Sequence, residues 1–234
     1  MYDQIVKTLN TLKSKEKIAI LQRFFKTGKG EYGEGDIFIG LTVPEQRKIA
    51  KQFQAAEFSD LKKLLQSKIH EHRLTALEIL VMKYEKAKSE SEKEKSVKFL
   101  LKNLRGVNNW DLVDLSAPYI LGDWLIDRKD RDVLYKFAVS KKLWERRIAI
   151  VSTYTLIRVG QFSDTIKICE ILMKDQQDLI HKACGWMLRE VGKKSEKTLI
   201  KFLNRNVKKM PRTMLRYSIE RLPEEFRLYY LRMK

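Results

Sequence analysis

Two tryptophans, one aspartate and one arginine have a spacing that could build a site for a partner. Trp110 and Asp114 are four residues apart, so on a helix they lie one turn apart on the same side. Trp186 stands in the row of Asp114 two related segments later, and Arg147 lies in the segment between them. Large aromatic side chains on a solvated face usually contact a partner. Two indoles flanking one carboxylate, with an arginine nearby, therefore predict a functional site.

The same residues also have an ordinary structural interpretation. Tryptophans at helical spacing belong more often to a core, and Leu77 and Val151 share the row of Asp114 and Trp186. Asp114 and Arg147 could form a surface salt bridge that contributes little stability. Spacing alone leaves both interpretations open.

The elements that must position these residues are helices. Apolar residues recur at three- and four-residue spacing along almost the whole chain, as in Leu61, Leu64 and Leu65, and no convincing alternating strand occurs. Thr42-Val-Pro-Glu45 fits a capping box, and helix starts are also expected at Ser59, Ser163 and Ser195. The sequence predicts an all-α protein.

An internal repeat organises these helices. Five segments align, and they begin at Arg73, Trp110, Arg147, Lys182 and Arg212, in steps of 37, 37, 35 and 30 residues. Helical hairpins of the HEAT type have similar periods and bury their apolar faces on their neighbours. We expect a right-handed α-solenoid of HEAT-like hairpins, with residues 1–234 as one repeat domain.

The register of the repeat separates two faces. The third and fourth residues of the segments should form the core, and they are Thr75, Ala76, Leu112, Val113, Ala149, Ile150, Cys184, Gly185, Met214 and Leu215. The first, fifth and eighth residues share a face turned away from that core. Its predicted phosphate-binding cations are Arg73, Arg147, Lys182, Arg189, Arg212 and Arg216.

The charge of the chain favours an anionic partner. The sequence has 48 Lys and Arg against 30 Asp and Glu, a net charge of +18. Residues 193–234 hold 13 of the cations and only 4 of the acids. A charge this large attracts polyanions over long distances, so nucleic acid leads the list of partners. Cations that only keep a helical surface soluble are the alternative.

Other features point away from cofactors and membranes. Cys169 and Cys184 should be buried, reduced thiols, and they form no zinc-binding pattern with His70, His72 and His181. Residues 27–40 hold five of the ten glycines and read as a flexible loop, without the spacing of a nucleotide-binding P-loop. We find no signal peptide or membrane span, and expect a soluble, cytoplasmic monomer without cofactor or metal.

Three segments resemble those of a known family. Asn109-Trp-Asp-Leu-Val-Asp114, Leu143-Trp-Glu-Arg-Arg-Ile-Ala149 and Lys182-Ala-Cys-Gly-Trp-Met-Leu-Arg-Glu190 are similar to stretches of the AlkD-like DNA glycosylases. The similarity runs from about Gly40 to Ile219. The Trp-x-x-x-Asp pair and the Gly-Trp-x-Leu-Arg-Glu string together are more specific than a HEAT period.

The resemblance implies an activity and roles for residues. Trp110 and Trp186 would match the family's two indoles that contact the deoxyribose, Asp114 its catalytic carboxylate, and Arg147 a DNA-contacting arginine. Members of the family excise cationic bases, such as 3-methyladenine and 7-methylguanine, from duplex DNA without turning the base into a pocket. The resemblance thus implies a monofunctional alkylpurine DNA glycosylase that associates with the nucleoid when bound to DNA.

One departure weakens the enzymatic part of this prediction. Members of the family place a short DNA-contacting helix just before the segment that matches Gly40–Arg47, where this chain has its glycine-rich stretch. Two alternatives therefore stay open. One is a non-catalytic binder of damaged, bent or branched DNA, and the other is a HEAT scaffold for an acidic protein.

Overall fold

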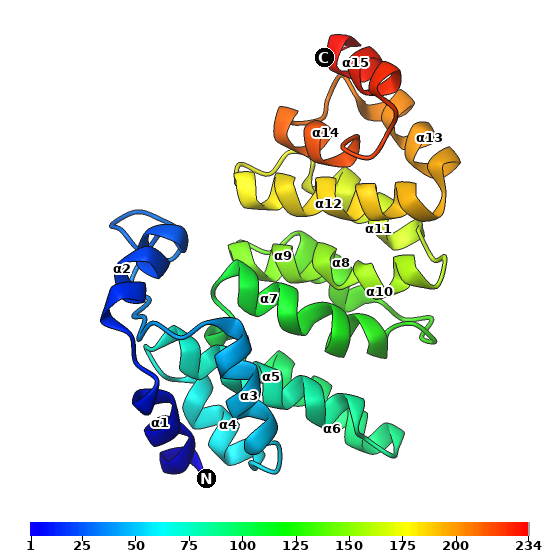
Figure 1. Cartoon of the computed structure of the whole chain (residues 1–234). Coiled ribbons are helices and arrows are strands. Elements are labelled where there is room, and N and C mark those ends of the chain that lie inside the picture. Colours follow the sequence, from blue (N-terminus) through cyan, green and yellow to red (C-terminus); the bar gives the residue numbers. More distant parts are fainter. Residues whose placement is uncertain (234) are drawn as a thin grey trace. The chain divides into compact units, whose positions relative to one another are not determined.

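The computed structural model describes residues 1–233 and is built from helices (Figure 1). Within the described residues, the one β-type pairing is an isolated parallel bridge between Ile37 and Ile69. The all-α prediction is confirmed. The chain divides into two compact units, Met1–Ser116 and the part from Ala117 onward, and each is described by itself. The assignment of residues 1–234 to a single domain stays a prediction.

The first unit is a set of short helices around one long one. Its helices are α1 (Tyr2–Thr11), α2 (Lys15–Phe24), α3 (Val43–Gln52), α4 (Phe58–Leu65), α5 (His70–Glu85), α6 (Glu90–Lys102), the 3-10 turn η1 (Leu104–Gly106) and α7 (Trp110–Ser116). Helix α5 packs against α3, α4, α6 and α7. It is therefore the centre of this unit.

The second unit has a similar plan. Its helices are the π-helical turn η2 (Ala117–Gly122), α8 (Asp132–Ala138), α9 (Leu143–Val151), α10 (Thr153–Arg158), α11 (Ser163–Leu172), α12 (Asp178–Lys194), α13 (Glu196–Asn206), α14 (Arg212–Ser218) and α15 (Glu224–Met233). Helix α12, yellow in Figure 1, packs against α9, α11, α13 and α14. It has the central place that α5 has in the first unit.

The predicted core of the repeat is confirmed in both units. All ten residues assigned to it from the register of the five segments are buried. Cys169 and Cys184 are buried, free thiols, as expected, and burial raises the pKa of the Cys169 thiol. Burying this apolar face supplies most of the stability that such short helices lack on their own.

The predicted helix starts are correct in part. Thr42 and Glu45 form the expected capping box, and the Ser195 hydroxyl accepts a hydrogen bond from the Thr198 N–H. Helix α4, however, starts before Ser59, because Glu57 and Asp60 form its capping box. Ser163 is the first residue of α11 and makes no cap of its own. At the start of α4, carboxylates therefore bind the free N–H groups for which a serine was expected.

Glycine is required where α12 meets α14. A Cβ atom on Gly185 would lie 2.6 Å from the Met214 carbonyl oxygen and 2.5 Å from the Tyr217 Cβ atom. Neither the backbone nor a Cβ atom can move without shifting the whole helix. The near contact of these two helices therefore depends on the missing side chain.

We predict that Gly185→Ala destabilises the protein by roughly 2 kcal/mol or more, because overpacked helix contacts usually cost 1–3 kcal/mol. Gly192→Ala in the same helix is the matched control. Its Cβ atom would meet only the Leu199 side chain, which can rotate, and alanine is the better helix former. Urea denaturation should separate the two variants. Equal stabilities would show that the α12–α14 contact can relax.

Candidate functional site

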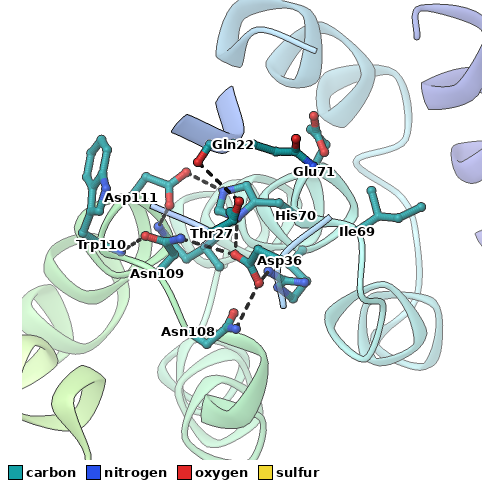
Figure 2. A network of polar contacts seen from close by, with 12 residues as sticks. Gln22, Thr27, Asp36, Ile69, His70, Glu71, Asn108, Asn109, Trp110 and Asp111 are labelled. Atoms are coloured by element: carbon teal, nitrogen blue, oxygen red, sulfur yellow. Dashed lines mark hydrogen bonds and ion pairs between the residues drawn. The ribbon is translucent and has the colours of Figure 1, made fainter. Parts of the chain in front are cut away.

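A buried polar network joins three segments of the first unit that are distant in sequence (Figure 2). The His70 ring lies between two carboxylates. Its Nδ1 atom is 2.9 Å from the Asp36 Oδ2 atom, and its Nε2 atom is 2.8 Å from the Asp111 Oδ2 atom. The His70 side chain is 1% exposed, and those of Asp36 and Asp111 are 3% and 12% exposed.

This geometry fixes the charge of His70. An ionised carboxylate only accepts hydrogen bonds, so both ring nitrogens must carry a proton and the ring is an imidazolium. Burial opposes that charge, but the Asp111 carboxylate and the hydrogen bonds to Asp111 and Asp36 outweigh burial and raise the pKa of His70 to about 9. His70 is therefore cationic at neutral pH.

Asp36 is the hub of the network. Its Oδ1 atom accepts hydrogen bonds from Arg73 Nη2 at 2.6 Å and Asn108 Nδ2 at 3.2 Å, and its Oδ2 atom accepts one from Asn109 Nδ2 at 3.3 Å. Burial alone would raise the pKa of Asp36, but the His70 hydrogen bond and the Arg73 charge hold it below the usual value. Two cations and two carboxylates thus balance one another.

The second half of the glycine-rich stretch is an integral part of this site. The backbone N–H groups of Ile39, Gly40 and Leu41 donate to the fully buried Glu71 carboxylate, at 2.8–3.3 Å. Asp36 and Phe38, in the same half of the stretch, are buried too. The prediction of a flexible surface loop is therefore wrong for this half, because a buried carboxylate on α5 binds its backbone.

Aromatic rings continue the network to Trp110. The Phe25 ring is stacked on the Trp110 indole, with ring centroids 5.2 Å apart and an angle of 14° between the planes. The Phe25 ring is also stacked on the Phe38 ring, with centroids 5.0 Å apart. Phe24 meets the indole edge-on at 5.8 Å, although its own side chain is 61% exposed. The Trp110 side chain is thus half-buried and held by a neighbour from the N-terminal segment.

Trp110 and Asp114 lie one turn apart on α7, as predicted. Both are half-buried. Asp111, which follows Trp110, is hydrogen-bonded to the His70 ring. The side chain of Asn109, which precedes Trp110, accepts a hydrogen bond from the Trp110 N–H at 2.8 Å. The start of α7 is therefore fixed on both sides of the indole by polar contacts.

Arg147 and Trp186 lie in the second unit, on the packed helices α9 and α12. The Arg147 side chain is buried, and its Nη1 atom donates to the Leu179 carbonyl at 2.7 Å. Trp186 is half-buried, with its ring 5.9 Å from that of Tyr154. Arg147 therefore joins α9 to the first turn of α12, the helix that carries Trp186.

The six predicted phosphate-binding cations are only partly exposed. Arg73 and Arg147 are 3% and 5% exposed, so the prediction that they stand on a solvated face is wrong. Arg73 instead binds Asp36 and the Ser67 carbonyl oxygen. Helical periodicity identifies the face of a residue, but it does not show that a loop carrying Asp36 covers that face.

The other four predicted phosphate-binding cations are accessible to different degrees. Lys182 pairs with Asp178 at 2.9 Å, and Arg189 pairs with Glu220. Arg212 and Arg216 are exposed on α14, and Arg212 Nη1 donates to the Leu231 carbonyl at 2.9 Å. The second unit therefore offers Arg212 and Arg216 most openly to an anionic partner.

The sequence does not predict Asp36, His70 and Asp111 as a group. The histidine pattern bears only on metal binding, and Asp36 stands in the stretch assigned to a loop. The signal was the density of hydrogen-bonding residues in Asn108-Asn109-Trp110-Asp111 just before a helix. Within the described residues, no cluster of three or more His, Cys, Asp and Glu side chains could hold a metal ion.

No helix within residues 1–233 has the length and apolar character that crossing a membrane requires.

The structure is that of an all-α protein of packed helical hairpins, with a half-buried indole–carboxylate pair, Trp110 and Asp114, one turn apart on α7. The chain belongs to the DNA alkylation repair enzyme family, whose model matches residues 5–222. No curated protein matches the sequence. A solved structure described as a predicted DNA alkylation repair enzyme from Enterococcus faecalis has the same fold, with a TM-score of 0.70 and 18% identity, over 91% of this chain and 97% of that chain.

The raised pKa of His70 predicts a loss of stability in mild alkali. The folded state holds a proton up to about pH 9, whereas an unfolded histidine releases it near 6.5. The stabilisation is complete below pH 6.5 and is lost as pH rises to 9, by about 1.4 kcal/mol per pH unit and on the order of 3 kcal/mol in total. Urea denaturation from pH 7 to 9 measures this slope.

A His70→Gln variant provides the control. It should be less stable than the parent at pH 7, and its stability should change little up to pH 9. Two other perturbed groups titrate lower, because burial holds the pKa of His72 at about 4 and raises that of Glu78 to about 7. The same slope in the parent and the variant would contradict the assignment to His70.

Proposed function

We propose that this protein excises cationic alkylated purines, of the 3-methyladenine and 7-methylguanine type, from duplex DNA by hydrolysing the N-glycosidic bond. Family membership supports a role in DNA alkylation repair. The observation that carries the finer proposal is the Trp110–Asp114 pair, a half-buried indole and carboxylate one turn apart on a helix that is fixed by the His70 network.

The chemistry needs electrostatic help more than a strong acid or base. An alkylated purine carries a positive charge and leaves as a neutral base, while the sugar gains the character of an oxocarbenium ion. A carboxylate near the sugar stabilises that cation and orients the attacking water. We assign this role to Asp114. The indoles of Trp110 and Trp186 would add attraction of about 0.5–2 kcal/mol each.

The way in which Trp110 is held supports this role. A ring that must lie against a sugar is most effective when its orientation is set before DNA binds. Phe25 is stacked on the Trp110 indole, and Asp111, the next residue along α7, is bound by His70. Protein therefore covers part of the indole, and its exposed part is available to the substrate.

The proposed reaction requires neither a metal nor a turned-out base. The leaving group is already activated by its charge, so a carboxylate and aromatic faces beside the strand are sufficient. This differs from enzymes that extrude a nucleotide into an enclosed pocket. Lys182, Arg189, Arg212 and Arg216 are assigned to the DNA-binding surface of the second unit. For the buried Arg147, the proposed contribution is to hold α12 in position.

The test is excision of 7-methylguanine from a defined duplex, measured as abasic sites in single-turnover conditions. We expect Asp114→Asn to lower the rate on the order of 100-fold or more, because one electrostatic partner of the developing charge is lost. Asp127→Asn is the matched control: it removes an exposed carboxylate in the second unit and should keep the parental rate.

The same experiment distinguishes the non-catalytic alternative. A parental protein that binds the duplex but releases no base above spontaneous loss would overturn the proposed activity. Tighter binding to branched or bent DNA than to linear duplex would then identify a DNA-structure binder.

A further inference from the structure

A cationic basin lies in the first unit, beside the His70 network. It has a volume of about 680 Å³, within the range of small-molecule sites. The glycine-rich stretch, the end of α4 and the residues around η1 contribute its walls. Four cations with long side chains line it, namely Lys62, Lys68, Lys102 and Arg105.

The basin is built by tight packing rather than by chance proximity. A Cβ atom on Gly106 would lie 2.5 Å from the Leu65 carbonyl oxygen. Glycine therefore lets the segment that carries Lys102 and Arg105 approach the end of α4, which carries Lys62. The buried Arg73 on α5 also binds the segment after α4, because its Nη1 atom donates a hydrogen bond to the Ser67 carbonyl oxygen at 2.8 Å.

The charges in the basin are not balanced. Arg73 is neutralised by Asp36, which leaves the four outer cations and one carboxylate, that of Glu34. The Glu34 carboxylate already accepts the Gly30 N–H at 2.8 Å. Within residues 1–233, none of the four outer cations is within ion-pair distance of a carboxylate.

We propose that this basin binds phosphate groups of a DNA strand and anchors the first unit on the substrate. Ammonium and guanidinium groups without a protein partner are the usual contacts of backbone phosphates. A volume of this size accommodates a nucleotide unit with its phosphate. The proposal rests on DNA as the substrate of the family, but it does not depend on base excision.

The anchor would act next to the proposed reaction site. Asp36 lies at the wall of the basin and binds His70, which in turn binds Asp111, the neighbour of Trp110. A strand held in the basin therefore contacts the same rigid network that fixes the indole. Lys62, Lys68, Lys102 and Arg105 would thus supply DNA contacts beside the glycine-rich stretch, where members of the family place their short DNA-contacting helix.

The experiment compares two triple variants of the same charge. Lys62→Gln, Lys102→Gln and Arg105→Gln remove basin cations, whereas Lys13→Gln, Lys48→Gln and Lys95→Gln remove three exposed lysines elsewhere in the first unit. Affinity for an unmodified duplex is measured against salt concentration. Each lost phosphate contact lowers the slope of log K against log salt by about 0.9.

We expect the magnitude of the slope of log K against log salt to fall by about 2–3 in the basin variant. Its affinity at low salt should fall on the order of 10-fold or more. Both losses should be much smaller in the control variant. Equal losses in the two variants would overturn the proposal, because they would reflect net charge alone. Since the duplex is unmodified, this outcome is separate from the failure of excision.

A second arm identifies the source of the phosphate. Inorganic phosphate and deoxyadenosine monophosphate are titrated against the parent and the basin variant by calorimetry. Binding of these free phosphates to the parent alone, together with an unchanged DNA slope in the basin variant, would assign the basin to a small phosphorylated ligand and overturn the DNA anchor. Weak or absent binding with a reduced DNA slope supports the strand.

Discussion

The charged histidine between two aspartates is the interaction on which the first unit depends. Asp36, His70 and Asp111 come from a loop, the start of α5 and the start of α7, and 34 to 75 residues separate them along the chain. Isolated charges in a protein interior are very costly, and removing one partner of a buried pair leaves the other uncompensated. The network is stable because Arg73 and His70 together match the two carboxylates. Its geometry therefore forces the three segments into one arrangement.

Much of the fold could be predicted from the sequence, because helical periodicity reports burial directly. Residues such as Ala76, Ile150 and Met214 were placed in the core from their register alone, and all are buried. The capping box at Thr42 was equally local information. The prediction was wrong where the deciding partner is distant. Arg73 occupies a face that would be solvated on an isolated hairpin, but Asp36 approaches it from 37 residues away.

The glycine-rich stretch is a second case in which a distant partner decides the structure. Its composition is that of a mobile loop, and composition carries no information about Glu71, whose carboxylate binds three consecutive backbone N–H groups. In the same stretch, Asp36 and Phe38 are buried, and Phe25 is stacked on both Phe38 and Trp110. The stretch is therefore the support of the candidate site rather than a connection above it. Gly33 and Gly40 let it pass close to other backbone, because a Cβ atom there would lie 2.3 Å from the Phe25 carbonyl oxygen and 2.1 Å from the Ser14 carbonyl oxygen.

This arrangement separates two tasks that a single cationic face would have to combine. Affinity for a polyanion needs exposed cations that are not already paired with carboxylates, as at Lys62 and Lys102. Stabilising a cationic transition state needs the opposite, namely fixed negative charge and aromatic faces with few competing cations nearby. Arg73 would disturb such a site if its charge were free. Because Asp36 neutralises Arg73 and Asp111 binds the charged His70, no unpaired cation of this network competes at Trp110, while the four outer cations of the basin keep their positive charge.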